Sequence, residues 1–597
     1  MENGEFAAAL RELADLLEFE EAELPKVAAY RKAAASIEAC AEDVERLARE
    51  GRLETLPGVG PWVSRLLGEL ARTGRLAALD EARDRLPRGV RDVIALPGVG
   101  PRRAARFLAV ARVASLSDLD RALRDGKLAR AGVAPADLET IARSLELARL
   151  GAGARPLGYV LPRARAIAER LASLPDVLRV RIAGEVRRGR GIVGELALAA
   201  AAESPEALLA AFRADPHVRL VLPPPAPGAA RVAIDEGLVV ALHTAAPAAF
   251  GSTLWRATGH ARHVEQVEAI LSRPRRGERP LTVREFEDER DVYEAARLAF
   301  VPPELREGRG EVEAAREGRL PRVVEAEEVE GDLRVQSDFT GGAHPPERLA
   351  AAAASAGLRW LAVVDPARGP RRPSGLDVER AARRAEVLAA ARSTASCGLV
   401  AGVEAPVAQG GVLEADPAVL ADAELCIAVL DPAGPLAACS RAERTAAVVR
   451  VLLEREADLV ALAPDPTGSP RGGADLAQAF GEEDADAPAE GRASVRPLAA
   501  FVDLGAILAA ASSAGAGLLV PAHAAGSLLG PADLRRAAAL GVPLALGSGA
   551  RAVQEMWSLE IGVALVRRAG LGPEALLNTR TEAELRAWLA ARRGARR

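Results

Sequence analysis

The hexapeptide Leu-Pro-Gly-Val-Gly-Pro occurs twice in this chain of 597 residues, at 56–61 and again at 96–101. Each copy precedes a stretch whose apolar residues recur with helical spacing. Glycine reaches backbone angles that are closed to other residues, so each copy predicts a tight turn between short helices. An identical repeat indicates paired structural units. We therefore expect residues 1 to about 150 to form short helices separated by glycine-proline turns.

A turn of this kind can hold a phosphate, because backbone N–H groups beside a helix N-terminus point outward. Such contacts grip the DNA backbone without reading its sequence. One copy would be an ordinary turn between helices, but two identical copies favour nucleic-acid binding. Residues 51–150 also contain 18 Lys and Arg against 12 Asp and Glu. The predicted contacts are Gly58, Gly60, Gly98 and Gly100 in the turns and, unless they form only a solvated helix face, Arg102, Arg103 and Arg106.

Composition narrows the classes of protein to which the chain can belong. Its length is too great for a single core, so several domains are expected. The formal net charge of −5 excludes a uniformly basic nucleic-acid binder but leaves room for a local basic face. The four cysteines form no CxxC pair, and no apolar run reaches the roughly 18 residues of a membrane span. With an acidic N-terminus unlike a signal peptide, we expect a soluble, cytoplasmic, nucleoid-associated protein without membrane contact.

The pattern changes after residue 150. From 156 to about 250, strand-like apolar runs alternate with helices and indicate a mixed sheet, and 250–320 is expected to be helical. From about 327, apolar strands recur between helices, which predicts a parallel barrel or a doubly wound sheet of about 270 residues. The acidic stretch at 481–493 is rich in Pro, Ala and Gly and predicts a solvated loop.

Several further segments can be read beside the two hexapeptide copies: AAYRKAAASIE (28–38), GEVRRGRGIVGEL (184–196), STLWRATGH (252–260), VPPELREG (301–308), EGDL (330–333) and LLNTRTEAEL (576–585). In the order and spacing of these motifs, the chain resembles the bacterial family X DNA polymerases, in which a helical repair-polymerase module is fused to a C-terminal PHP phosphoesterase domain.

The resemblance implies a multidomain α+β and α/β fold. Residues 1–85 would form a helical DNA-end-binding domain with the first helix-hairpin-helix, and 86–152 a fingers-like domain with the second. A nucleotidyltransferase-like palm would follow at 153–250, a helical or mixed thumb-like domain at 251–328, and a PHP-like distorted β/α barrel at 329–597.

The palm of this family carries three carboxylates that bind two magnesium ions. In this chain Glu195 replaces the first Asp and Ala197 the second, and the third position is expected at Ala241. One vestigial carboxylate, Glu195, cannot hold two hard divalent ions. No intact catalytic residue and no cofactor are therefore expected, and Mg or Mn would be needed only if activity remained.

The family's phosphate-binding Gly-Ser motif is also altered, because Glu185 stands at the Ser. Gly184, Arg187 and Arg188 are retained and could bind a nucleotide phosphate, with a solvated basic turn as the alternative. Lyase chemistry would need a lysine on the helix after the first turn, where Leu66 stands instead. Three residues match the part of the family that holds a 5′ phosphate, and a surface-charged helix face is their alternative: Lys26, Tyr30 and Lys32.

The PHP motifs have lost the histidines that supply most ligands of a trinuclear zinc or manganese site. Arg334, Gln336, Pro366 and Arg551 stand at positions that matter for that site, and the two arginines repel cations. The surviving carboxylates are expected to pair with arginines in the barrel mouth. A rebuilt Mg or Mn site is the weaker hypothesis, and its candidate ligands are Asp365, Glu404, Asp431, Asp465 and His523.

Three functional hypotheses follow. The first is a binding module for gapped, nicked or single-strand-containing DNA in repair, acting through residues 20–150, with the rest as a scaffold for repair proteins. The second is an active repair DNA polymerase or 3′-5′ exonuclease that uses non-standard metal ligands. The third is a drifting paralogue without a biochemical role. Retained hairpins beside lost metal ligands favour the first.

Overall fold

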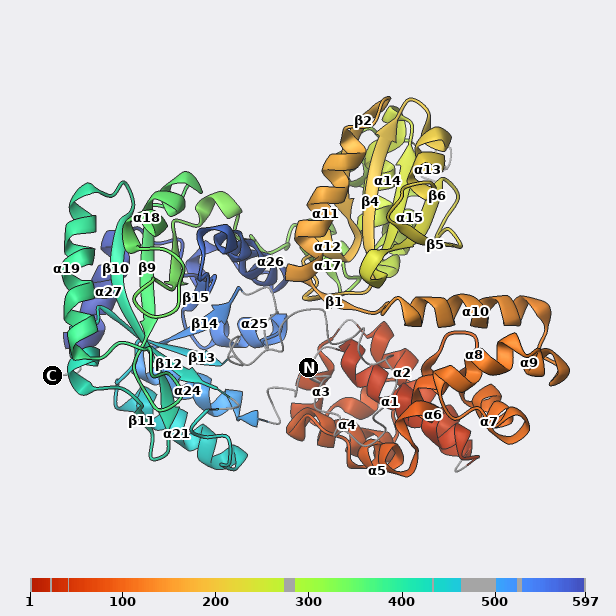
Figure 1. The fold of residues 1–597 in the computed structure, drawn as a ribbon, viewed down its shortest axis with the longest axis horizontal. Coiled ribbons are helices and arrows are strands. Elements are labelled where there is room, and N and C mark those ends of the chain that lie inside the picture. The colour runs from red at the N-terminus through yellow and green to blue at the C-terminus, as the bar shows by residue number, and fades with distance from the viewer. Residues whose placement is uncertain are drawn as a thin grey trace.

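Three lobes follow one another along the chain, and Figure 1 shows them in colour order from red to blue. Helices build the first lobe, a mixed sheet with helices the second, and a parallel sheet wrapped into a barrel the third. This is a multidomain α+β architecture, as expected from the sequence. The computed structural model describes residues 3–21, 24–40, 42–272, 285–431, 434–462, 501–522 and 529–594.

The helices of the first lobe pack around one apolar core. Phe6 and Leu10 of α1 lie in the same cluster as Phe107 of α7 and Leu145 of α10. The core therefore continues across residue 85, where the sequence suggested a boundary between two domains. These helices are α1 (Asn3–Phe19), α2 (Leu24–Ala39), α3 (Val44–Arg49), α4 (Pro61–Thr73), α5 (Ala77–Arg85), α6 (Arg88–Ala95), α7 (Gly100–Ala111), α8 (Leu116–Arg124), α9 (Lys127–Arg130) and α10 (Pro135–Arg149).

Both copies of the repeated hexapeptide form a turn directly before a helix. In the first copy the N–H of Val59 donates to the carbonyl oxygen of Leu56 at 3.0 Å, and the second copy makes the same bond at the same distance. Gly58 and Gly98 lie at φ +82° and +87°, the left-handed region that favours glycine. Helices α4 and α7 follow these turns, as the apolar periodicity predicted.

The second lobe is built on a five-stranded sheet in the order β2-β4-β7-β6-β5. Every residue of the central strand β4 is buried, because helices α11 and α13 pack on the face of Leu198 and helix α14 packs on the face of Ala197. β4 pairs in parallel with β7, and the other pairings are antiparallel. The bounds are α11 (Leu157–Ala172), β2 (Val177–Ala183), β4 (Leu196–Ala202), α13 (Pro205–Arg213), β5 (Val218–Leu222), β6 (Ala229–Ile234), β7 (Val239–Ala245) and α14 (Phe250–Thr258).

A small helical cluster completes this lobe. Trp255 of α14, Val267 of α15 and Tyr293 of α16 share an apolar core, and α17 packs against it through Val312. The short helix α12 links β2 to this cluster through arginine contacts described below. The bounds are α12 (Gly184–Arg187), α15 (Ala261–Leu271), α16 (Glu289–Ala296) and α17 (Glu311–Arg316).

The third lobe is a parallel sheet in the order β15-β14-β13-β12-β10-β9-β8. The N–H of Gly549, after β15, donates to Arg334 of β8 at 2.8 Å, so the sheet is nearly closed into a barrel. Trp360 lies inside, and helix α27 covers one end, where the carbonyl oxygen of Arg580 accepts from the Trp360 indole N–H at 2.8 Å. The strands are β8 (Gly331–Val335), β9 (Trp360–Pro366), β10 (Gly398–Ala408), β12 (Leu425–Leu430), β13 (Leu459–Leu462), β14 (Gly517–Pro521) and β15 (Leu544–Gly547).

Helices surround this barrel, as Figure 1 shows for α18, α19 and α26. In the part of the chain that the structure describes, no helix is both long enough and apolar enough to cross a membrane. The helices around the barrel are α18 (Pro346–Ser355), α19 (Val378–Thr394), α21 (Arg441–Leu453), α24 (Leu504–Ala514), α25 (Pro531–Ala539), α26 (Leu559–Arg568) and α27 (Glu582–Gly594).

Candidate nucleic-acid interface and the predicted metal positions

The first hairpin carries a half-exposed indole among cations. Trp62 on α4 directly follows the first hexapeptide, and 47% of its surface is exposed. Its Nε1–H donates to the hydroxyl of buried Tyr30 at 2.9 Å, which fixes the ring. The Lys26 ammonium lies 4.9 Å from the ring centroid and the Arg65 guanidinium 5.5 Å, within the range of cation–π attraction. We call Lys26, Tyr30, Lys32, Trp62 and Arg65 the Trp62 face.

Lys32 joins this face to the hairpin turn. A Cβ atom on Gly58 would lie 2.8 Å from Lys32 Cγ, so the stem of the lysine crosses the glycine backbone. Gly58 therefore has two reasons to be glycine, its positive φ and this close approach. The structure thus brings the two predicted lysines and Tyr30 to one hairpin.

The second hairpin presents an arginine where the first presents Trp62. Arg102 directly follows the second hexapeptide, and its side chain is 82% exposed although its Nε donates to Glu18 at 2.7 Å. Arg103 donates to the carbonyl oxygen of Gly98 at 2.6 Å and to Asp137 at 2.7 Å, and Arg106 donates to a nearby backbone carbonyl. Arg103 and Arg106 therefore hold the hairpin in place, and Arg102 is the arginine best placed to meet a phosphate.

The conformational argument for the four hairpin glycines holds at three of them. Gly58, Gly98 and Gly100 have positive φ, whereas Gly60 lies at φ −90°. A Cβ atom on Gly60 would meet nothing within 4 Å. The expectation that Gly60 needs a backbone angle closed to other residues is therefore wrong, because this residue is an ordinary extended cap of α4.

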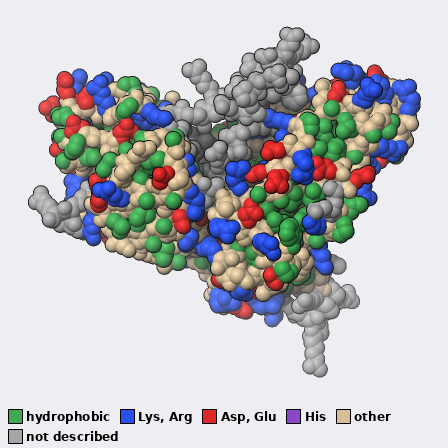
Figure 2. Space-filling model, turned by 90° about the horizontal axis from the view of Figure 1, so that it is seen from below, with side chains coloured by type: hydrophobic (Ala, Val, Ile, Leu, Met, Phe, Trp, Pro, Cys, Tyr) green, Lys and Arg blue, Asp and Glu red, His purple; other side chains and the backbone are tan. Residues whose placement is uncertain are grey.

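Charge on the surface agrees with a local basic face. In Figure 2, basic side chains gather toward the end of the molecule formed by α7, α8 and α9, and both signs are interspersed over much of the rest of that face. Arg121 and Arg124 of α8 are 68% and 73% exposed. The acidic net charge of the whole chain therefore coexists with a basic region in the helical lobe.

The two retained arginines of the second lobe have carboxylate partners. Arg187 forms a two-point contact with Glu289, at 2.5 and 2.9 Å, and Arg188 donates to Glu307 at 2.9 Å. Burial alone would raise the pKa of Glu289, but Arg187 and Arg306 lower it to about 2. Both arginines thus tie α12 to the helices that follow. A nucleotide phosphate near Gly184 would compete with these carboxylates.

The three positions of the implied polymerase metal site lie together on neighbouring strands. Ala197 of β4 stands directly beside Ala241 of β7, and Arg231 of β6 stands beside Ala241 on its other side. Arg231 Nε lies 2.5 Å from a carboxylate oxygen of Glu195, just before β4. Two methyl groups and one carboxylate neutralised by arginine do not fit a pair of divalent ions.

Glu185, at the position of the family's Ser, serves the local backbone. Its Oε2 accepts from the N–H of Gly194 at 2.6 Å and so closes the loop between α12 and β4. A Cβ atom on Gly184 would lie 2.8 Å from the Cβ of Ala197, so even alanine at 197 packs tightly against this turn.

The barrel mouth is likewise occupied by ion pairs. Asp365 accepts from the Ser337 hydroxyl at 2.7 Å, from the Thr340 hydroxyl at 2.6 Å and from Arg384 at 3.0 Å. These donors surround a fully buried carboxylate and leave it poorly placed to bind a metal. Hydrogen bonding within the protein therefore accounts for its burial.

Glu404 is held between two arginines. Arg334 Nε donates to it at 2.6 Å and Arg372 at 2.8 Å. Although burial opposes the effect, these guanidinium groups keep the pKa of Glu404 below its usual value. Arg551 lines the same pocket. The surroundings of Glu404 and Asp365 do not fit the implied zinc or manganese cluster.

The remaining metal candidates do not complete such a cluster. Asp431 follows β12 and is partly buried, and Asp465 and His523 lie outside the described residues. Among the residues that the structure describes, no group of three or more His, Cys, Asp or Glu side chains could hold a metal ion.

Comparison with known proteins connects these features to a family. Residues 1–76 match the model of a helix-hairpin-helix domain, the structure to which the first hexapeptide belongs. The chain is also 26% identical over 419 residues to the DNA polymerase/3′-5′ exonuclease PolX of Bacillus subtilis. The aligned region covers 68% of this chain and 72% of that protein. Both matches agree with the resemblance to the bacterial family X DNA polymerases that the motifs indicated.

Sequence reasoning did not single out Trp62 or Arg65. The available signal was the position of Trp62, directly after the first hexapeptide and equivalent to Arg102 after the second. A tryptophan there is as compatible with a core as with a surface, so only its exposure in the structure makes it a candidate contact.

Proposed function

We propose that this protein binds DNA that contains a gap, a nick or a single-stranded stretch, and that it does so through residues 20–150 without extending a primer. The observation that carries the proposal is the Trp62 face, where an indole that is 47% exposed lies beside Lys26 and Arg65 at a hairpin turn. The helix-hairpin-helix match and the DNA polymerase among its relatives support it.

The chemistry of this face favours a DNA end or gap over an intact duplex. A base can stack on an indole only if it is not enclosed between neighbours in a continuous duplex, and unpaired bases meet that condition. The nearby cations would neutralise the phosphates on either side. The second hairpin would add a backbone contact through Arg102, in keeping with its exposure.

Catalysis is the alternative, and the name of the relative favours it, because that protein is a DNA polymerase and 3′-5′ exonuclease. Divalent metal would then be required. The pairing of Glu195 with Arg231, together with Ala197 and Ala241, argues against a polymerase site of the family's type. The arginines around Glu404 argue in the same way against a phosphoesterase site. We therefore favour a pseudoenzyme.

The wider assignments are part of the same proposal. The helical lobe would provide the DNA-binding domains at 1–85 and 86–152, followed by a palm at 153–250, a thumb at 251–328 and a PHP-like barrel at 329–597. The catalytically silent part would serve as a scaffold for repair proteins. Such a protein would work in the cytoplasm on the nucleoid.

Fluorescence anisotropy with the full chain tests the proposal. We expect tighter binding to a labelled duplex with a one-nucleotide gap than to the intact duplex, with an affinity that falls steeply as salt rises. Trp62→Ala should weaken binding to gapped DNA by about tenfold, since stacking on one aromatic side chain contributes about 1–3 kcal/mol.

The matched controls lie on the same helix. Arg65→Ala should weaken binding, whereas Arg72→Ala, two helical turns further along α4, removes the same charge away from the indole and should have a smaller effect. Equal affinity of the parent and Trp62→Ala for gapped DNA would remove the Trp62 face from the interface and, with it, the basis of the proposal.

A further inference from the structure

A pocket of about 280 Å³ opens at the carboxyl ends of the barrel strands. Functional groups of β/α barrels gather at this end, because the loops that follow the strands meet there. Strands β8, β9 and β10 contribute to the wall, together with the segment after β15 and the loop after β9. The lining residues used below are Arg334 of β8 and Gln336 just after it, Arg371 and Arg372 of the loop, Glu404 of β10, and Arg551.

The charge of this lining is strongly positive. Four arginines, Arg334, Arg371, Arg372 and Arg551, face the pocket, and Glu404 is the one carboxylate among its described lining residues. Glu404 is engaged by Arg334 and Arg372, at 2.6 and 2.8 Å. The guanidinium groups of Arg371 and Arg551 make no ion pair or hydrogen bond with any residue in the described ranges. The pocket therefore holds more cationic donors than its own acceptor can satisfy.

The loop that carries two of these arginines is well defined. The N–H of Arg368 donates to Leu376 at 2.9 Å and that of Leu376 to Pro366 at 2.8 Å, so the loop folds back on the end of β9. A Cβ atom on Gly375 would lie 2.5 Å from the carbonyl oxygen of Ala367, which shows how tightly the two arms pack. The backbone that carries the two arginines is therefore already ordered, which lowers the entropic cost of binding a ligand.

We propose that this pocket is a metal-independent binding site for a phosphate group. The planar guanidinium group donates paired N–H bonds that match phosphate oxygens, and several around one pocket can bind a multiply charged oxyanion. The volume is just below the roughly 300–1,000 Å³ of pockets for larger organic ligands and so fits a phosphate, a diphosphate or the terminal phosphate of a strand.

This inference accounts for residues that the metal hypothesis leaves unexplained. Where the resemblance implies metal ligands, Arg334 and Arg551 supply fixed positive charge, and the adjoining loop adds Arg371 and Arg372. Arginine attracts a phosphate without an ion to bridge it. In this proposal, arginine side chains provide the positive charge that bound metal ions would otherwise provide, and the pocket binds phosphate through them.

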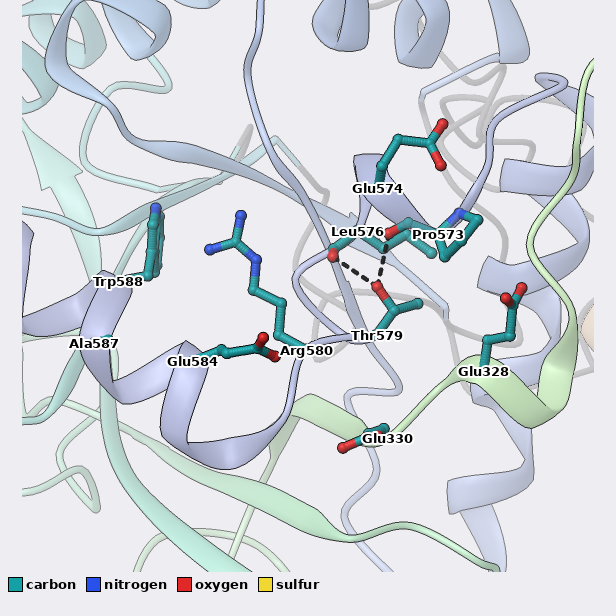
Figure 3. Close-up of a pocket in the computed structure, with 10 residues that line it drawn as sticks. All are labelled: Glu328, Glu330, Pro573, Glu574, Leu576, Thr579, Arg580, Glu584, Ala587 and Trp588. Atoms are coloured by element: carbon teal, nitrogen blue, oxygen red, sulfur yellow. Dashed lines mark hydrogen bonds between the residues drawn. The ribbon is translucent and has the colours of Figure 1, made fainter.

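A second pocket shows that positive lining is not a general property of the barrel. It measures about 800 Å³ and lies beside α27, at the opposite end from the arginine pocket. Figure 3 shows Glu328, Glu330, Glu574 and Glu584 around it with Arg580 as its arginine. Four carboxylates repel a phosphate, so Arg580 supplies a matched control position within the same lobe.

Isothermal titration calorimetry of the full chain with inorganic pyrophosphate tests the site, at low ionic strength with EDTA present. We expect one pyrophosphate per chain. The double variant Arg371→Ala/Arg551→Ala should bind at least tenfold more weakly, and Arg580→Ala should bind as the parent does. Arg371→Ala alone, a change at an exposed loop position, should weaken binding in a protein whose thermal unfolding is unchanged.

Competition distinguishes the sources of the phosphate. Displacement of pyrophosphate by a 5′-phosphorylated trinucleotide, but not by its unphosphorylated form, would support the site and identify a strand terminus as a ligand. Resistance to both trinucleotides would support a site for free phosphates. Because pyrophosphate has no base, its binding is independent of the proposed DNA-binding function. An absence of binding to the parent, or equal binding by the folded double variant, overturns the proposal.

Discussion

The carboxyl group of Asp332 is buried in the barrel and links two of its strands. Its Oδ1 accepts from the N–H groups of Arg334 and Ser548, both at 3.0 Å, and so links β8 to the end of β15. Its Oδ2 is buried without a hydrogen-bond partner among the described residues. Burial raises the pKa of Asp332 to about 6 despite these donors. The folded protein therefore retains a proton that the unfolded chain releases near pH 3.8.

The sign of the resulting pH dependence can be tested with Asp332→Asn. The favourable contribution of the protonated acid is complete below pH 3.8 and is lost as the pH rises through 6, at a cost of about 3 kcal/mol. We expect Asp332→Asn to unfold at a higher temperature than the parent at pH 8 and at the same temperature near pH 4. Scanning calorimetry at both values measures the difference.

Asp458→Asn is the control for this prediction. Asp458 is equally buried, but it has a cationic partner in Arg592, whose Nε donates at 3.2 Å. Its replacement should lower the unfolding temperature at pH 8. If Asp332→Asn behaves like Asp458→Asn, the Asp332 carboxylate is stabilised by its surroundings and the argument from burial is wrong.

Single residues also show what the sequence could and could not predict about the candidate sites. The family resemblance points to Glu195, Ala197 and Ala241, and the register of β4 and β7 places the two alanines side by side. Ion pairs across long stretches of sequence, such as Arg187 with Glu289, were not predictable. Their partners are 102 residues apart, and only the packed fold brings them together.

Among the elements, the first hairpin allows the most direct test of backbone conformation. Gly58 combines a φ of +82° with close packing by Lys32, whereas Gly60 is extended and open. We expect Gly58→Ala to destabilise the helical lobe by about 1–2 kcal/mol and to weaken DNA binding, because an L side chain is strained in the left-handed region. Gly60→Ala should leave both unchanged. Thermal unfolding and anisotropy of the full-chain variants provide the two measurements.

The opposite pattern would have a specific meaning. If Gly60→Ala weakens DNA binding as much as Gly58→Ala while unfolding at the parental temperature, the space beside Gly60 is occupied by DNA in the complex. The conformational account of the hairpin would then be contradicted, and close approach of a phosphate would replace it.

An ion pair joins helices α12 and α16. Glu289, at the start of α16, contacts Arg187 of α12 and Arg306, which holds the pKa of Glu289 near 2 against the effect of burial. The stabilisation, about 3 kcal/mol, is complete above the usual pKa of 4.5 and is lost as the pH falls toward 2. Glu289→Gln should therefore be less stable than the parent at pH 7, with a gap that narrows from pH 5 to pH 3.

The control for Glu289→Gln is Glu287→Gln. Glu287 is 62% exposed, and its contact with Arg179 at 3.1 Å lies at the surface. Surface pairs of this kind contribute little, so this variant should match the parent across the range. Acid-induced unfolding followed by circular dichroism measures both. A difference between parent and Glu289→Gln that does not change with pH would contradict the assigned pKa.

Elements were predicted unevenly. The hairpin turns and the helices after them followed directly from glycine and apolar spacing. The central strand β4 did not, because its sequence, LALAAAA, is rich in a strong helix former. It is a strand because helices cover both of its faces, and burial on two sides suits small apolar residues. Tertiary packing therefore overrides local preference at the element that carries Ala197.

At the scale of the whole molecule, α26 connects the barrel to the second lobe. Arg567 of α26 donates to Glu304 at 2.8 Å and to the carbonyl oxygen of Val324 at 2.6 Å. A Cβ atom on Gly189 would lie 2.8 Å from Ala564 of the same helix. Strand recurrence predicted a barrel or a doubly wound sheet but could not predict closure between β15 and β8, or this joint, because both join segments that are distant in sequence.

The organisation of the whole chain leads to a last prediction, about nucleotide incorporation. A polymerase needs a lobe that holds the DNA and a second lobe that holds two metal ions at the primer end. This chain has hairpins in its helical lobe. In the second lobe, the positions implied for the metal site are Glu195, Ala197 and Ala241, with the guanidinium group of Arg231 beside Glu195. We expect the full chain to bind a gapped template without incorporating a nucleotide, in Mg²⁺ or in Mn²⁺.

A primer-extension assay on a gapped template, with the Glu195→Ala variant beside the parent, decides between binding and catalysis. Both proteins should leave the primer unextended, because one carboxylate paired with Arg231 cannot organise two ions. Anisotropy on the same template shows that each preparation binds. Template-directed extension by the parent that disappears in Glu195→Ala would mean that other carboxylates complete the site, and the chain would then be an enzyme with an unfamiliar ligand set.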